Sequence, residues 1–151
     1  MDISDLADLF QIAGAGVWAG KWLKVAWEGR KTEKADIAIV VNISRPITKD
    51  VQRFLEEQAI DAHVVRISNV KRFGPRTEEW KGAVAEFAKA LRTIQERMGA
   101  KTFHIFLSAP SVITMAMGCV LGQDYKARLY HRFPDKETYV LVLKVPEDFP
   151  Q

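Results

Sequence analysis

The sequence predicts an α/β fold, a three-layer sandwich whose mostly parallel β-sheet ends in an antiparallel hairpin and whose N-terminus is helical. Two observations lead to this prediction. From residue 36 onward, apolar segments of strand length alternate with longer segments of helical periodicity, the order typical of α/β proteins. The last two apolar segments are separated only by a short turn, which is typical of a hairpin.

The N-terminal residues 3–30 are predicted to be helical, with a break near Gly14 and Gly16, each of which weakens a helix by about 1 kcal/mol relative to alanine. Two apolar stripes at helical spacing support this prediction: Ile3, Leu6, Leu9 and Phe10 form the first, and Val17, Trp18, Trp22, Val25 and Ala26 form the second. A charged connector follows over residues 30–35. We therefore expect residues 1–35 to form a helical segment with its connector, and residues 36–151 to form the α/β domain.

Within that domain the first strand is the clearest. Residues 36–43 are almost continuously apolar and β-branched, which is typical of a central parallel strand covered on both faces. Further strands are expected over residues 62–67, 102–107, 127–132 and 138–145. Helices are expected over residues 49–58, 77–98 and 111–121, with Thr48 and Thr77 as candidate N-caps and with Gly99 and Gly122 as terminators.

The composition is that of a soluble globular domain with a small positive charge. The chain has 151 residues, 48% hydrophobic and 27% charged, with a formal net charge of +3. That charge suits an anionic partner but argues against duplex DNA as the partner. The single cysteine, Cys119, excludes an internal disulfide, and Asp2 and Asp5 stand where a secretion signal would be positive. We therefore expect a cytoplasmic protein without a membrane partner.

Two predicted strand ends offer a site for an anion such as a phosphate or nucleotide. In an open α/β sheet, ligands bind beyond the carboxyl ends of the strands. The strands ending near Asn42 and Leu107 each lead into a helix, whose first N–H groups and partial positive charge attract anions. The cationic loop 68–76 is a candidate lid, with Phe73 as a candidate base-stacking ring. The expected ligand-binding residues are Ser44, Arg45, Pro46, Thr48, Lys71, Arg72, Ser108, Ala109, Pro110 and Ser111.

Simpler interpretations of the same residues stay open. Ser44, Thr48 and Ser111 are equally explained as helix caps, and the cationic loop as a solvated surface loop. The sequence shows no catalytic or metal-binding constellation, because His63, His104 and His131 are scattered without metal-ligand spacing. His104 lies within a predicted strand, so we expect it to be buried and hydrogen-bonded. We therefore expect a protein that is not an enzyme and needs no cofactor or metal.

Three segments resemble SAVED, a sensor domain of bacterial anti-phage effectors in the CBASS and type III CRISPR systems. Residues 37–44, followed by the helix start Thr-Lys-Asp-Val, resemble the family's first conserved strand and loop. Residues 104–110 resemble its His-Leu-Phe…Pro segment. Leu129-Tyr130 and residues 139–143 resemble its closing, tyrosine-bearing hairpin. The resemblance covers residues 36–145 and implies a Rossmann-like, CARF-like fold.

The resemblance also implies a function. A SAVED domain senses a cyclic oligonucleotide, so the ligand expected here is a cyclic di-, tri- or tetranucleotide whose binding is coupled to oligomerisation. The alternatives are a ring nuclease that degrades this messenger, or a non-catalytic interaction or regulatory module that uses the predicted helix with Trp18, Trp22 and Trp27 as a contact surface.

The length of the chain bears on how the binding site is completed. A full SAVED domain contains two CARF-like halves, and 151 residues have room for one of them. The rest of the site is therefore expected from a homo-oligomer or a partner chain. A fragment of a larger effector, a stand-alone half-domain and a relative with a changed role all fit the sequence.

Overall fold

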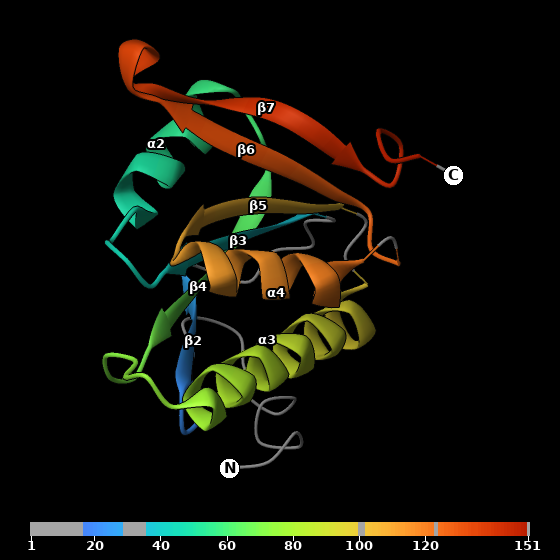
Figure 1. Ribbon diagram of the computed structural model, residues 1–151. Helices are drawn as coiled ribbons and strands as arrows, with labels where there is room; N and C mark the ends of the chain where they lie inside the picture. Colours follow the sequence, from blue (N-terminus) through green and yellow to red (C-terminus); the bar gives the residue numbers. More distant parts are fainter. Residues whose placement is uncertain (1–16, 29–35, 100–101, 123, 151) are drawn as a thin grey trace.

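The computed structural model describes residues 17–28, 36–99, 102–122 and 124–150, and these form a seven-stranded mixed sheet with three α-helices (Figure 1). The N-terminal and last strands of the chain lie at the two edges. In chain order the elements are β1 (Val17–Ala19), β2 (Leu23–Glu28), β3 (Asp36–Asn42), α2 (Thr48–Glu57), β4 (Ala62–Asn69), α3 (Thr77–Met98), β5 (Thr102–Ser108), α4 (Ser111–Leu121), β6 (Ala127–Phe133), the 3₁₀ turn η1 (Pro134–Lys136) and β7 (Thr138–Val145).

The sheet has the strand order β1-β2-β4-β3-β5-β6-β7. Its three central pairings, β4 with β3, β3 with β5, and β5 with β6, are parallel. The outer pairings, β1 with β2, β2 with β4, and β6 with β7, are antiparallel. The terminal hairpin β6–β7 is therefore confirmed, but the expectation of a mostly parallel sheet is wrong because β1 and β2 add antiparallel pairs at the other edge.

The helix predicted over the N-terminal residues is wrong where the structure describes them. Residues 17–19 and 23–28 are the strands β1 and β2, joined by a turn in which the Gly20 N–H donates to the Leu23 carbonyl at 2.8 Å. Leu23, Val25 and Trp27 alternate with Lys24, Ala26 and Glu28, and the first three belong to one buried cluster. Alternate residues of a strand point to the same face, and Val25 and Trp27 are of types that favour strands. The segment therefore forms a strand although its apolar residues also fit a helical spacing. The rest of the predicted helical segment and the connector 30–35 lie outside the described residues.

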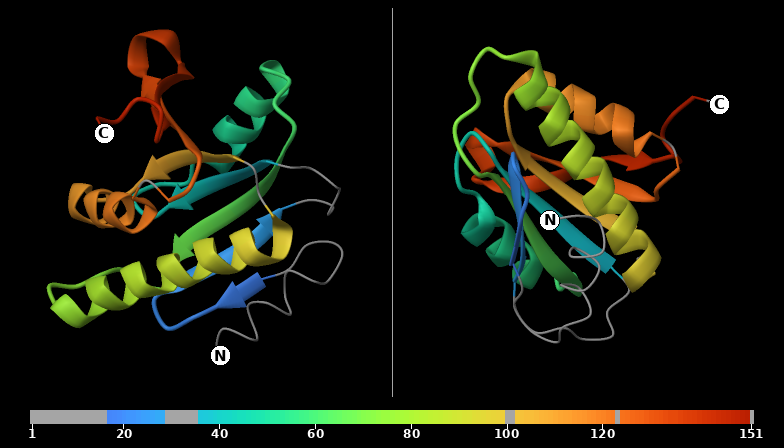
Figure 2. Two further views of the ribbon diagram at one scale, coloured as in Figure 1. Left: turned by 90° about the vertical axis from the view of Figure 1, so that its right-hand side faces the viewer. Right: turned by 90° about the horizontal axis from the view of Figure 1, so that it is seen from below.

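The sheet is covered on both faces, which gives the predicted three layers (Figure 2). Residues of β3 that alternate in sequence belong to different cores. Ile37, Ile39 and Val41 pack with α3 and α4, whereas Ala38 and Val40 pack with α2. Burial on both sides explains why the β3 sequence is apolar throughout. The helices turn apolar stripes to these cores: Val51, Phe54 and Leu55 on α2, and Ala83, Phe87, Ala90, Leu91 and Ile94 on α3.

Candidate anion-binding site

Three parallel strands end level with one another at the carboxyl edge of the sheet, on the left in Figure 1. Asn42 at the end of β3 pairs with Ser68 of β4 on one side and with Ser108 of β5 on the other. The chain leaves β3 toward α2 on one face and leaves β5 toward α4 on the opposite face. The two connections therefore diverge to opposite faces of the sheet. The crevice between such diverging connections is where open α/β sheets bind their ligands.

The loops that follow β3 and β5 are bonded to each other. The backbone N–H groups of Ile43 and Ser44 both donate to the Ser108 carbonyl at 2.8 Å. The structure thus brings together the two predicted halves, residues 44–48 and 108–111. Ser44, Arg45, Pro46 and Ser111 are exposed, whereas Thr48 and residues 108–110 are half-buried.

Asn42, which was predicted only as the end of a strand and not as a site residue, fixes the path of the first loop. Its side-chain amide donates to the Thr48 hydroxyl at 2.7 Å, and its carbonyl oxygen accepts the Ile47 backbone N–H at 2.8 Å. An asparagine at the end of a strand, six residues before a helix threonine, is the sequence signal for this arrangement.

The helices that start at this edge have no side-chain caps. The N-cap residue is Ile47 for α2 and Pro110 for α4, and neither helix has a side-chain capping bond within the described part of the chain. Ser44, Thr48 and Ser111 are therefore not explained as caps, and Thr48 and Thr77 each stand one residue inside their helices. The first N–H groups of α2 and α4 stay available to an anion, with the positive ends of both helix dipoles beside them.

A groove of about 630 Å³ opens beside the start of α2. It is lined by Asn42, Pro46, Ile47, Thr48, Lys49, Asp50, Gln52 and Arg66. Lys49 and Arg66 were not predicted as site residues. Arg66 lies two residues before Ser68 and shares the α2 face of β4 with Val64. The sequence feature that could have indicated Arg66 as a site residue is a single cation near the carboxyl end of an apolar strand.

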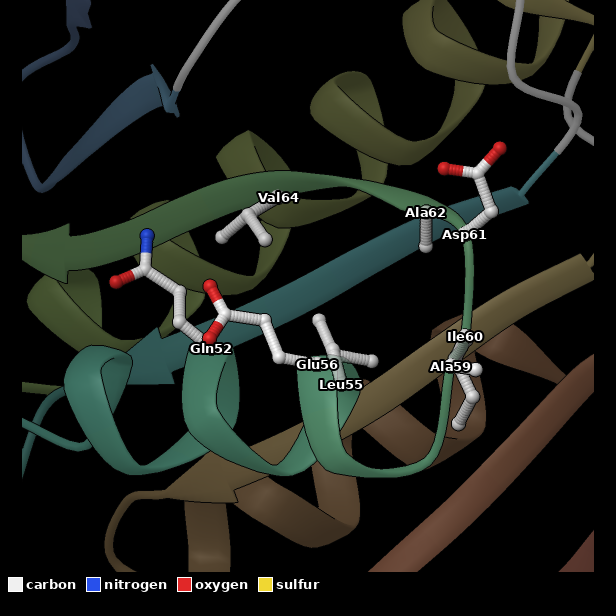
Figure 3. A pocket seen from close by; sticks show the side chains of 8 residues that line it. All are labelled: Gln52, Leu55, Glu56, Ala59, Ile60, Asp61, Ala62 and Val64. Atoms are coloured by element: carbon white, nitrogen blue, oxygen red, sulfur yellow. The ribbon is translucent and has the colours of Figure 1, made fainter.

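A second groove, of about 590 Å³, lies further along α2 (Figure 3). Its walls are formed by Gln52, Leu55 and Glu56 of α2, by the turn 59–61, and by Ala62 and Val64 of β4. The residues that line it include two acids, Glu56 and Asp61, and no lysine or arginine. Because the first groove carries the cations, it is the better site for an anion.

The cationic loop after β4 is anchored away from Ser44. The ammonium of Lys71 lies 5.7 Å from the ring centroid of Trp22, on the β2 side of β4. Phe73 packs on Trp80 of α3 with their ring centroids 5.3 Å apart, and the Trp80 indole N–H donates to the Gly74 carbonyl at 2.8 Å. The predicted stacking ring, Phe73, is therefore already packed against α3, while Arg72 is exposed to solvent.

His104 is buried and hydrogen-bonded, as predicted, and is 1% exposed. Its Nε2 lies 2.9 Å from an Asp36 carboxylate oxygen and its Nδ1 lies 2.8 Å from the Tyr130 hydroxyl. Since a carboxylate only accepts, Nε2 carries the proton and the Tyr130 hydroxyl donates to Nδ1. Burial lowers the pKa of His104, against the opposing effect of Asp36. The residue lies four positions before Ser108, about 13 Å from the candidate site.

The described residues contain no cluster of three or more His, Cys, Asp or Glu side chains that could hold a metal ion. Within the same ranges, no helix is long and apolar enough to cross a membrane.

Comparison with known proteins agrees with this architecture. A family model described as "SMODS-associated and fused to various effectors sensor domain" matches residues 21–145. Two solved structures of the Acinetobacter baumannii Cap4 SAVED/CARF-domain containing receptor, one with the cyclic trinucleotide 3′3′3′-cAAA and one with 2′3′3′-cAAA, each match with a TM-score of 0.72 and 18% identity over 84% of this chain. A further structure of that receptor matches with a TM-score of 0.65 and 15% identity over 82% of this chain.

The chain is much shorter than these receptors. It covers 28% of each of the two trinucleotide complexes and 26% of the third structure. The comparison with curated proteins gives no match.

Proposed function

The chain belongs to the SAVED family of sensor domains, and from this premise we propose that it binds a cyclic oligonucleotide at the carboxyl edge of β3 and β5, as a sensor in anti-phage defence. The observation that carries the proposal is the pair of uncapped helix starts at residues 48 and 111. The loops that lead into them are joined by the bonds from the Ile43 and Ser44 N–H groups to the Ser108 carbonyl. Two such starts at one edge of the sheet, with Lys49 and Arg66 in the adjacent groove, suit a ligand with more than one phosphate.

The ligand class is supported by the fold match. The receptor structures that share this fold hold cyclic trinucleotides, so a cyclic trinucleotide is the first ligand to test here. Catalysis is not part of the proposal. The two candidate general bases for such a nuclease, His63 and His104, are 2% and 1% exposed, and recovery of intact ligand after incubation would separate a sensor from a ring nuclease.

We further propose that ligand binding is coupled to assembly through α4. This helix begins at the candidate site and carries no charged residue along its eleven positions. Val112 and Met115 are 68% and 75% exposed, and an apolar groove of about 520 Å³ separates the helix from α3. A second copy of the chain is the proposed occupant of this face, because pairing two such faces would bury their exposed apolar side chains.

The experiment is a thermal melt with a panel of cyclic di-, tri- and tetranucleotides. At 100 times the dissociation constant, a ligand that binds only the folded state adds about 2.7 kcal/mol, which raises Tm by about 5–11 °C in a domain of this size. Arg45→Glu places a negative charge at the site and should abolish the shift. Lys126→Glu, at the amino edge just before β6, is the matched control and should leave the shift intact. Absence of a shift with every ligand would contradict the proposal.

A further inference from the structure

The turn between β1 and β2 presents an aromatic ring with two lysines. The Trp22 side chain is half-buried, and the ammonium groups of Lys21 and Lys71 lie 5.0 Å and 5.7 Å from the centroid of its ring. Both lysines are exposed, and within the described ranges neither forms an ion pair with a carboxylate. Two positive charges from different loops therefore lie beside one indole, neither of them in an ion pair with a described carboxylate.

The ring and its lysines are held in place by hydrogen bonds to the backbone. The Glu86 carboxylate on α3 accepts the N–H groups of Trp22 at 3.0 Å and Leu23 at 3.1 Å. The Trp22 carbonyl accepts the Val70 N–H at 2.8 Å, which joins this turn to the loop that carries Lys71. The Asn69 side-chain amide donates to the Lys71 carbonyl at 3.0 Å. The surface is thus organised before any ligand arrives.

Two glycines allow this arrangement. A Cβ at Gly20 would collide with the Glu86 carboxylate, and a Cβ at Gly82 would collide with the Trp22 indole. The indole therefore rests directly on the backbone of α3. By contrast, a Cβ at Gly118 on α4 would meet nothing within 4 Å, so Gly118 offers a matched control for a substitution at Gly82.

Trp22 lies at the same edge of the sheet as the candidate site. Leu23 pairs with Asn69 at the end of β4, and the preceding residue Ser68 pairs with Asn42 of β3. Adjacent strands are about 4.8 Å apart and Trp22 stands two residues beyond the level of Asn42, so the two backbones lie about 12 Å apart. A ligand of several nucleotides with one phosphate at the helix starts would have to span this distance to reach Trp22.

We propose that Trp22 is a stacking platform for one base of the ligand and that Lys21 and Lys71 bind the neighbouring phosphate; this inference rests on the proposed function. Bases stack on aromatic side chains beside cationic grooves in proteins that bind single-stranded nucleic acids, and an aromatic ring with nearby cations suits both parts of a nucleotide. Trp22 thus takes the role that the sequence suggested for Phe73, whose ring packs on Trp80.

The test measures the Kd of 3′3′3′-cAAA by calorimetry for the wild-type chain and its variants. Trp22→Ala should raise Kd by about 5- to 150-fold, the range for loss of one stacked base, and Trp22→Phe should raise it by less. Gly82→Ala keeps the ring but displaces it, so it should also raise Kd, whereas Gly118→Ala should not. Lys21→Gln with Lys71→Gln should weaken binding and flatten its salt dependence.

Fluorescence provides a second readout that does not need Trp22→Ala to fold. Ligand should quench part of the wild-type tryptophan emission, and Trp22→Phe should remove most of that quenching, because Trp18 and Trp27 are each 4% exposed and Trp80 is half-buried against Phe73. Equal Kd values in the wild type, Trp22→Phe and the double lysine variant, without quenching, would overturn this inference and leave the proposed function standing. If the wild type binds none of 3′3′3′-cAAA, 2′3′3′-cAAA and cyclic di-AMP, the proposed function itself fails.

Discussion

Replacing Asn42 tests how the candidate site is held together. Asn42→Ala removes the bonds to Thr48 and Ile47, each worth about 1 kcal/mol net, and leaves the buried Ile47 N–H without its acceptor. We therefore expect a loss of about 2 kcal/mol in the free energy of unfolding. For a domain of this length that loss lowers Tm by about 4–8 °C. Thermal and urea denaturation followed by circular dichroism measure both quantities.

Asn42→Asp separates the role of this residue in stability from its role in binding. A carboxylate can accept the Ile47 N–H and the Thr48 hydroxyl proton, so both contacts are kept and stability should stay within about 1 kcal/mol of wild type. A new negative charge about 6–8 Å from a bound phosphate costs roughly 2–3 kcal/mol at an effective dielectric constant near 20, which raises Kd roughly 30- to 150-fold. Calorimetry measures this effect. A wild-type Tm for Asn42→Ala, or a wild-type Kd for Asn42→Asp, would refute the reasoning.

Three further predictions concern the rest of the fold. Because burial lowers the pKa of His104, the folded state favours the neutral ring, and this stability is lost as pH falls. The stability advantage of wild type over His104→Gln, measured in denaturant titrations, should therefore shrink between about pH 7 and pH 5. A constant difference would contradict this. Gly82→Ala should cost about 1–3 kcal/mol through its clash with Trp22, whereas Gly118→Ala should gain up to about 1 kcal/mol, and equal urea midpoints would contradict the contrast. Val112→Ser with Met115→Ser, which adds no charge near the anion site, should weaken ligand-driven assembly in sedimentation without lowering Tm, and unchanged assembly would exclude α4 as the contact.

Much of the fold could be predicted from the sequence because its central elements have unambiguous periods. β3 is apolar over residues 37–41 because both of its faces are covered, and α3 repeats its buried residues at helical spacing and ends at Gly99 in the left-handed region. The segment 17–28 was predicted wrongly because Trp18, Trp22 and Val25 fit a helical stripe, while Leu23, Val25 and Trp27 fit an alternating one. The pairing of β2 with β4, which is distant in the sequence, makes this segment a strand and not a helix.

The candidate site was predicted only in part, and for a related reason. Residues 44–48 and 108–111 follow directly from where two strands end, and the structure bonds these loops together. Arg66 and Trp22 reach the same edge from segments distant in the sequence, so only the strand order reveals them. Lys71 is placed beside Trp22 by the Val70 N–H bond to the Trp22 carbonyl, which no local pattern indicates.

The most direct test of the central claim is a titration of ¹⁵N-labelled protein with 3′3′3′-cAAA, followed by amide chemical shifts, because this measurement detects weak binding and locates it. We expect the largest shifts in residues 42–50 and 108–113, at the starts of α2 and α4, while amides near Asp36 and Thr102 at the amino edge stay unchanged. An unchanged spectrum at millimolar ligand, or shifts confined to the amino edge, would contradict it.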